Sequence, residues 1–135
     1  MMPGSRGRVH GNIVELSPGN LICLLRSRSA DHIYRSESHD NGETWSVPEP
    51  TVLRNNNASI TAIRLQSGAV CVVYNDVAFN DEPEHTVWPD QRCPVVLAIS
   101  EDGGKAGPGG VSSSTARALS VRGTTSTTAV TNIPA

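Results

Sequence analysis

The sequence lacks an apolar run long enough to cross a membrane. Its longest runs, Leu21–Leu25 and Ala69–Tyr74, have the length of a β-strand, whereas a membrane helix needs about 20 apolar residues. The first residues, Met1–Arg6, also lack the apolar core of a signal peptide. We therefore expect no membrane partner. The location stays unknown, with the cytoplasm as the default expectation.

Basic clusters and an even set of cysteines are missing too. The eleven Lys and Arg residues are scattered over a chain with a formal net charge of -2, which predicts no nucleic-acid partner. The three cysteines cannot all pair, and Cys23 and Cys71 lie in apolar runs, where a reduced thiol acts as a small hydrophobic side chain. We expect no metal ion and no cofactor.

One motif, in contrast, occurs twice. Ser38–Trp45 and Ser100–Lys105 share the pattern Ser-x-Asp-x-Gly, and the first copy completes it with Trp45. Two apolar runs separated by a glycine turn, at Gly19 and at Gly68, precede each copy. The chain therefore contains two copies of one structural unit.

Short apolar or alternating runs between turn residues predict antiparallel strands in a meander, and no segment has a helical period. The first unit has four predicted strands, whereas the second has three and lacks its fourth. The predicted strands are Asn12–Leu16, Leu21–Arg26, His32–Ser38 and Pro50–Leu53, then Ser59–Leu65, Val70–Tyr74 and Val95–Ser100.

The repeated motif has the composition of a tight turn. Asp40 can accept hydrogen bonds from amides of its own loop, Gly42 permits a positive φ, and Trp45 can bury its ring against the strands. We therefore predict that the motif is structural and that its aspartates are not catalytic acids. The motif residues of the two copies are Ser38, Asp40, Gly42, Trp45, Ser100, Asp102 and Gly104.

The complete motif resembles the Asp box of sialidase-type (BNR repeat) β-propellers, and the resemblance extends from about Val9 to Lys105. Val14-Glu15-Leu16 and Asn55-Asn56-Asn57, together with the second motif, make the chain similar to the predicted-neuraminidase branch. The resemblance implies an all-β fold, a partial β-propeller of about two four-stranded antiparallel blades with an irregular C-terminal tail. Such a chain would be a fragment, about a third of a six-bladed propeller.

The implied domains are an N-terminal extension (residues 1–9), a first blade (10–53), a second, incomplete blade (54–107) and a tail (108–135). The Ser/Thr-rich composition of the tail predicts disorder. A frameshift near Lys105 is the second hypothesis. Degenerate codons for residues 106–111, read from their third base, permit Trp-Ala-Trp-Arg-Arg, which would complete the second motif.

Consecutive loops of a meander lie at opposite edges of the sheet. The Asp boxes and the turns at Gly19 and Gly68 therefore share one edge, and the candidate site lies at the other. An insertion near Val77–Asp90, which contains Phe79 and Trp88, could wall a glycan pocket there or be disordered. The predicted pocket residues at this edge are Asn56, Asn75 and Asp76.

Arginines at this edge point to an acidic ligand, because the planar guanidinium fork suits a carboxylate. By resemblance, Arg26 and Arg92 correspond to two of the three arginines that hold the carboxylate of sialic acid in sialidases. Arg28 and Arg35 are weaker alternatives, since surface arginines in ion pairs would look the same.

His10 is the candidate catalytic residue, and it stands where the resemblance places the glutamate that activates a tyrosine nucleophile. A histidine can act as a base near neutral pH but lacks the negative charge of a glutamate. The acid/base aspartate and the tyrosine of the family would lie in blades outside this chain, and Tyr34 and Tyr74 do not match the nucleophile's motif. We therefore expect the isolated chain to be inactive.

Several functions stay open. The first is a truncated, sialidase-like glycan-processing protein whose parent is an exo-glycosidase acting on acidic sugars. A binding module for acidic glycans, a fragment of a uronate-directed lyase or hydrolase, and a product with no selected role are the alternatives. The expected partner is an acidic glycan, sialic or uronic, and bare blade faces would also allow self-association.

Overall fold

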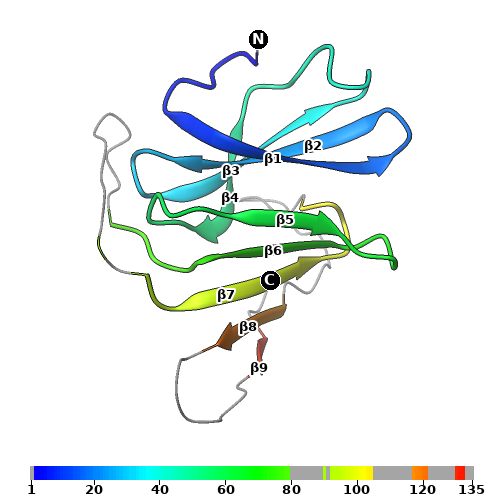
Figure 1. The fold of residues 1–135 in the computed structure, drawn as a ribbon. Helices are drawn as coiled ribbons and strands as arrows, with labels where there is room; N and C mark the ends of the chain where they lie inside the picture. The colour runs from blue at the N-terminus through cyan, green and yellow to red at the C-terminus, as the bar shows by residue number, and fades with distance from the viewer. Residues whose placement is uncertain (1, 80–89, 91, 105–116, 122–129, 133–135) are drawn as a thin grey trace.

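The computed structural model describes residues 2–79, 90, 92–104, 117–121 and 130–132. These residues form two antiparallel sheets and, within the described ranges, no helix (Figure 1). The first sheet contains β1 (Arg8–Ser17), β2 (Asn20–Ser27), β3 (His32–Ser38) and β4 (Glu49–Arg54). The second contains β5 (Thr61–Arg64), β6 (Val70–Asn75), β7 (Val95–Ser100), β8 (Arg117–Val121) and β9 (Val130–Asn132). In each sheet the strands are neighbours in chain order, which confirms the predicted meander and the all-β class.

β1 begins at Arg8, and Val9 is paired with Arg26, while the predicted domain boundaries stay a prediction. One expectation about the second unit is corrected. The fourth strand predicted to be missing from the second unit is present, since β8 pairs with β7 and β9 pairs with β8. The Ser/Thr-rich composition of the tail did not predict this strand, because pairing with the open edge of β7 depends on tertiary context more than on local composition. The frameshift proposed near Lys105 and the predicted pocket wall at Trp88 fall outside the described residues.

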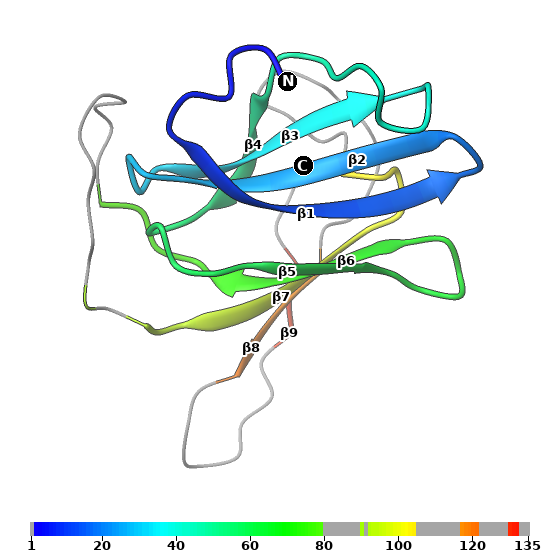
Figure 2. The same ribbon diagram turned by 45° about the horizontal axis from the view of Figure 1, so that its top comes forward.

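The two sheets pack face to face around one apolar core (Figure 2). Alternate side chains of β1, β2, β6 and β7 point into it, as the two-residue period of a half-buried strand requires. β1 and β5 lie side by side, and the Asn12 side chain joins them by donating to the Ile60 carbonyl (3.2 Å) and accepting from the Ala62 amide (3.3 Å). The buried core residues are Val14, Ile22, Leu24, Ile33, Ile60, Val70, Val72, Tyr74, Val96 and Ala98.

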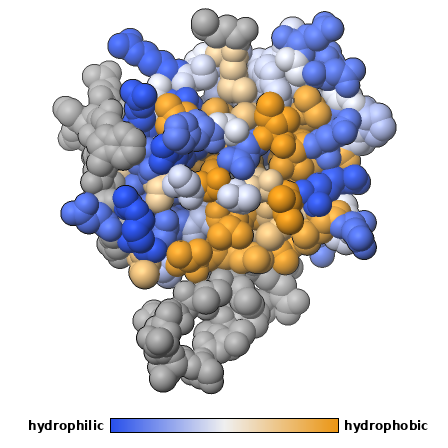
Figure 3. All heavy atoms as spheres, viewed as in Figure 1, coloured by the Kyte–Doolittle hydropathy of each residue, from blue (hydrophilic) through white to orange (hydrophobic). Residues whose placement is uncertain are grey.

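The outer faces of the two sheets differ. On the first sheet, Met2 and Trp45 pack against a small cluster formed by Cys23, Leu25 and Tyr34. On the second sheet, the exposed apolar side chains include Ile63 (54% exposed), Val73 (39%) and Val95 (39%). Apolar residues accordingly gather over the lower strands of the molecule in Figure 3. Self-association through this face stays a prediction.

The two Asp boxes form turns with equivalent hydrogen bonds. In the first, the Ser38 hydroxyl donates to Asp40 (2.7 Å) and accepts from the Gly42 amide (2.9 Å), while Asp40 accepts from the Thr44 amide (2.9 Å). In the second, the Ser100 hydroxyl likewise donates to Asp102 and accepts from the Gly104 amide (2.6 Å). Positive φ angles occur at equivalent positions, Asn41 and Gly42 in one box and Gly103 and Gly104 in the other. The second turn therefore closes without an equivalent of Trp45, whose indole N–H donates to the Gly42 carbonyl in the first (2.9 Å).

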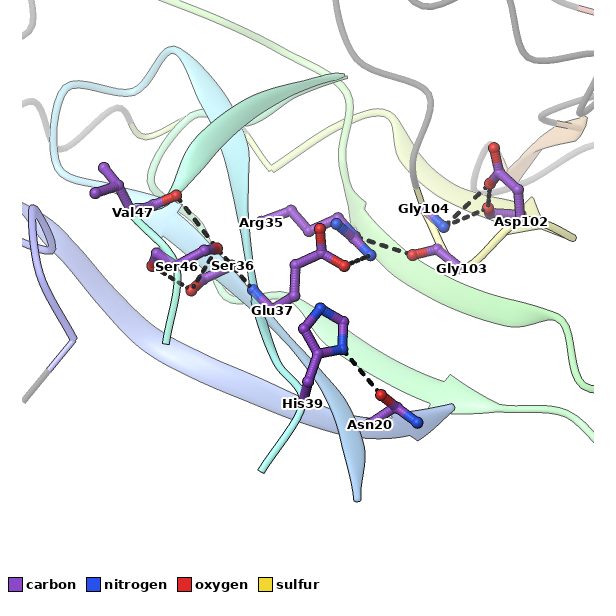
Figure 4. A network of polar contacts seen from close by, with 11 residues as sticks. Asn20, Arg35, Ser36, Glu37, His39, Ser46, Val47, Asp102, Gly103 and Gly104 are labelled. Carbon is purple, nitrogen blue, oxygen red and sulfur yellow. Dashed lines mark hydrogen bonds and ion pairs between the residues drawn. The ribbon is translucent and has the colours of Figure 1, made fainter. Parts of the chain in front are cut away.

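Arg35 fastens the first sheet to the second Asp box (Figure 4). Its Nε donates to the Gly103 carbonyl (3.0 Å), and its Nη2 forms an ion pair with Glu37 (3.3 Å). Gly103 has a φ of 70°, which favours glycine, and a Cβ there would also lie 2.8 Å from Leu16 Cδ1 of the first unit. Both Asp boxes thus turn the chain between strands, and the second also links the two sheets.

Acid should weaken the first Asp box. Hydrogen bonds from the Thr44 side chain and amide and from Ser38 lower the pKa of Asp40 from 3.8 to about 2. Because the pKa of the folded state lies below its ordinary value, the box contributes stability above about pH 4 and loses it as the pH falls through about 2. Thermal unfolding followed between pH 5 and 2 should show this loss, and Asp40→Asn should lose less over the same range. Equal pH dependence of the two proteins would contradict the assignment.

Candidate functional site

The edge opposite the Asp boxes carries the candidate site. The Asn41 amide donates to the Gly19 carbonyl (3.1 Å), so the first Asp box and the Gly19 turn lie together, as predicted. Chain reversal at the end of β2 and the link between β4 and β5 then bring the candidate residues to the other edge. Among these candidates, His10 is in contact with Arg26, and the positive charges of Arg28 and Arg92 act on it.

Arg26 lies near the end of β2 and is 6% exposed. Its Nη1 donates to the Asn57 carbonyl (2.5 Å), and its Nη2 donates to His10 Nδ1 (2.9 Å). Both partners come from other parts of the chain, β1 and the link after β4, and they hold the guanidinium from two directions. Arg26 is therefore a fixed cation at the junction of the two blades.

His10 reaches Arg26 because β1 is irregular at this point. The pairing of β1 with β2 shifts register between Val9 and Asn12, and His10 has a φ of 51°. Such a bulge changes the direction of a side chain that would otherwise follow the alternation of the strand. Glycine at position 11 permits this bulge, because a Cβ there would lie only 2.6 Å from Cys23 Sγ.

Two further arginines act on Arg26. Burial lowers the pKa of Arg26, and the positive charges of Arg28 and Arg92 lower it further. Both of these side chains are exposed. We call Arg26, Arg28 and Arg92 the arginine cluster. It combines one buried and two exposed guanidinium groups, and repulsion among them would be relieved by a bound anion.

The predicted pocket residues have supporting contacts. The Asn75 side chain donates to the Arg92 carbonyl (2.6 Å) and so holds the backbone of a cluster residue. Asn56 is fully buried, and its Oδ1 accepts from the Ala58 amide (3.3 Å), which stabilises the link that carries Asn57. Asp76 instead pairs with Arg54 (3.1 Å).

Other candidates are placed elsewhere. Arg35 lies among the Asp-box contacts and is not part of the arginine cluster. Tyr34 donates to Asp31 Oδ2 (2.8 Å), and its burial, together with Asp31, raises its pKa to about 12. Tyr74 belongs to the core, and burial raises its pKa strongly. Neither tyrosine is placed to act as a nucleophile at neutral pH.

Sequence reasoning missed the contributions of Asn57 and Arg8. Asn57 has a φ of 61°, and its carbonyl accepts from Arg26. Asparagine tolerates this conformation better than most residues, so the run of three asparagines was an available signal. Arg8 lies over the Tyr34 ring, with 3.5 Å from its guanidinium carbon to the ring centre, and no local pattern predicts that contact.

Within the described ranges, no group of three or more His, Cys, Asp or Glu residues could hold a metal ion. No helix formed by the described residues is long and apolar enough to cross a membrane.

Comparison with known families agrees with the two blades. A family model described as a BNR repeat-like domain matches residues 1–106, a span that contains both Asp boxes and all candidate site residues. No curated protein matches the sequence. Because the match covers most of the chain and ends just after the second Asp box, the chain belongs to the BNR repeat-like family.

Proposed function

We propose that the arginine cluster binds the carboxylate of an acidic sugar, either a sialic acid or a uronic acid. The observation that carries the proposal is the setting of Arg26, which is buried, held by His10 and Asn57, and acted on by the positive charges of Arg28 and Arg92. A carboxylate can accept paired hydrogen bonds from a guanidinium that is already oriented, so little entropy is lost on binding.

Binding without cleavage fits the acidic residues near the cluster. Most glycosidases need two carboxyl groups that flank the scissile bond, whereas sialidases use a tyrosine nucleophile, a role for which neither Tyr34 nor Tyr74 is placed. Two carboxylates of the described residues near this edge have other partners, since Asp31 accepts from Tyr34 and Asp76 pairs with Arg54. Asp90, two positions before Arg92, is exposed. We therefore propose that this chain recognises an acidic glycan and that any processing of the glycan belongs to a longer parent.

Calorimetric titration of the purified chain tests the proposal. The ligands are methyl α-sialoside, methyl glucuronide and the neutral methyl glucoside. We expect saturable binding of one or both acidic sugars, at least about tenfold tighter than the neutral one and weaker at high salt. Each acidic sugar is also incubated with the chain, and no turnover is expected. Equal affinity for the neutral sugar, or no binding of either acid, would overturn the proposal.

A further inference from the structure

We propose that His10 contacts the ligand as a hydrogen-bond donor, held in a single tautomer by Arg26, and that it helps the site to select anions. The inference rests on the proposed function, because it assigns a role within the same carboxylate site. It differs from the role of a general base that the sequence suggested for His10.

The tautomer follows from the contact between the two side chains. A guanidinium can only donate hydrogen bonds, so the 2.9 Å contact between Arg26 Nη2 and His10 Nδ1 makes Nδ1 the acceptor. A neutral imidazole that accepts at Nδ1 carries its proton at Nε2. The second ring nitrogen of His10, an exposed residue, is therefore an N–H donor.

Backbone geometry independently marks the same residue. A positive φ is uncommon for residues other than glycine and is found where the surrounding structure enforces it, often at binding sites. His10 has a φ of 51° within the β1 bulge, and Gly11 leaves room for Cys23 behind it. The fold thus holds His10 in an unfavourable conformation that brings its ring to Arg26.

The side chains of the site therefore offer hydrogen-bond donors. Arg26, Arg28 and Arg92 can only donate, and His10 in this tautomer donates from Nε2. A carboxylate offers only acceptors and matches such a set. In this state His10 cannot act as a base, because one ring nitrogen carries the proton and the lone pair of the other is bound to Arg26.

The first test is made on the chain without ligand. Long-range ¹⁵N–¹H correlation spectra of the imidazole nitrogens distinguish the two tautomers. We expect His10 to be protonated at Nε2 in the wild-type chain and to lose this preference in Arg26→Met. Protonation at Nδ1 in the wild-type chain would overturn the inference.

The second test compares two substitutions of nearly equal size. His10→Gln keeps an acceptor for Arg26 and a donor for the ligand, whereas His10→Glu offers no donor and adds a negative charge. Both replacements are disfavoured similarly by the positive φ, so this strain cancels between them. We expect His10→Gln to bind the acidic sugar within about threefold of wild type and His10→Glu to bind at least about tenfold more weakly.

The control lies at the opposite edge. His39 is an exposed residue within the first Asp box, where its ring contacts Asn20 (2.9 Å), and His39→Glu adds the same charge without touching the arginine cluster. We expect His39→Glu to bind like wild type. Equal weakening by His10→Gln and His10→Glu would overturn the donor role while carboxylate binding by the wild-type chain stands. Absence of that binding, with protonation at Nε2 still observed, would overturn the proposed function itself.

Discussion

Replacing Arg26 by methionine is expected to weaken binding of the acidic sugar by at least about 30-fold. Methionine fills much of the same volume but removes a charged donor from a buried position, a loss that costs about 2 kcal/mol or more. It also leaves the Asn57 carbonyl and His10 Nδ1 without their donor. We therefore expect the free energy of unfolding to fall by about 1–3 kcal/mol as well.

Arg26→Lys and Arg64→Met make this prediction specific. Lysine keeps the charge but lacks the planar fork, so it cannot hold Asn57, His10 and a carboxylate together, and its affinity should lie between those of wild type and Arg26→Met. Arg64 is an exposed arginine beside the Gly68 turn, and Arg64→Met removes an equal charge at the opposite edge. Calorimetric titration and chemical denaturation measure both quantities. If Arg26→Met and Arg64→Met bound the sugar alike, the carboxylate would have to bind elsewhere.

Replacing Ile22 by alanine is expected to lower the free energy of unfolding by about 2–5 kcal/mol. Ile22 is fully buried in the core between the two sheets, where truncation removes transfer free energy and leaves a cavity. Ile13, on the neighbouring strand, is 61% exposed. Ile13→Ala should change the free energy of unfolding by no more than about 0.5 kcal/mol.

The two isoleucine variants separate burial from strand propensity, because each exchanges a β-branched residue for alanine within the first sheet. Urea denaturation followed by tryptophan fluorescence gives both values, provided that chain concentration is held constant to exclude effects of association. A similar loss for Ile13→Ala would mean that the exposed face of β1 is covered in solution. A small loss for Ile22→Ala would contradict the shared core.

The sequence predicted at which edge the candidate residues lie, but not what each of them contributes. The arginines and His10 were assigned to one edge because alternation of loops in a meander is a topological rule, and the contact between Arg26 and His10 agrees with it. The partner of each arginine could not be predicted from the sequence. Arg35 and Arg28 look alike in sequence, yet Arg35 binds Gly103 of the second Asp box, whereas the charge of Arg28 acts on Arg26.

The sequence by itself determined the all-β meander, the bounds of β3 and β7, and the turns of both Asp boxes. These features depend on side-chain alternation and on turn residues such as Gly42, which act within a few positions of the chain. Only the tertiary structure decided the bulge at His10, the bond from Arg26 to the Asn57 carbonyl and the pairing of β8 with β7. Each of these joins segments distant in sequence, and such contacts depend on register and packing, which local composition does not encode.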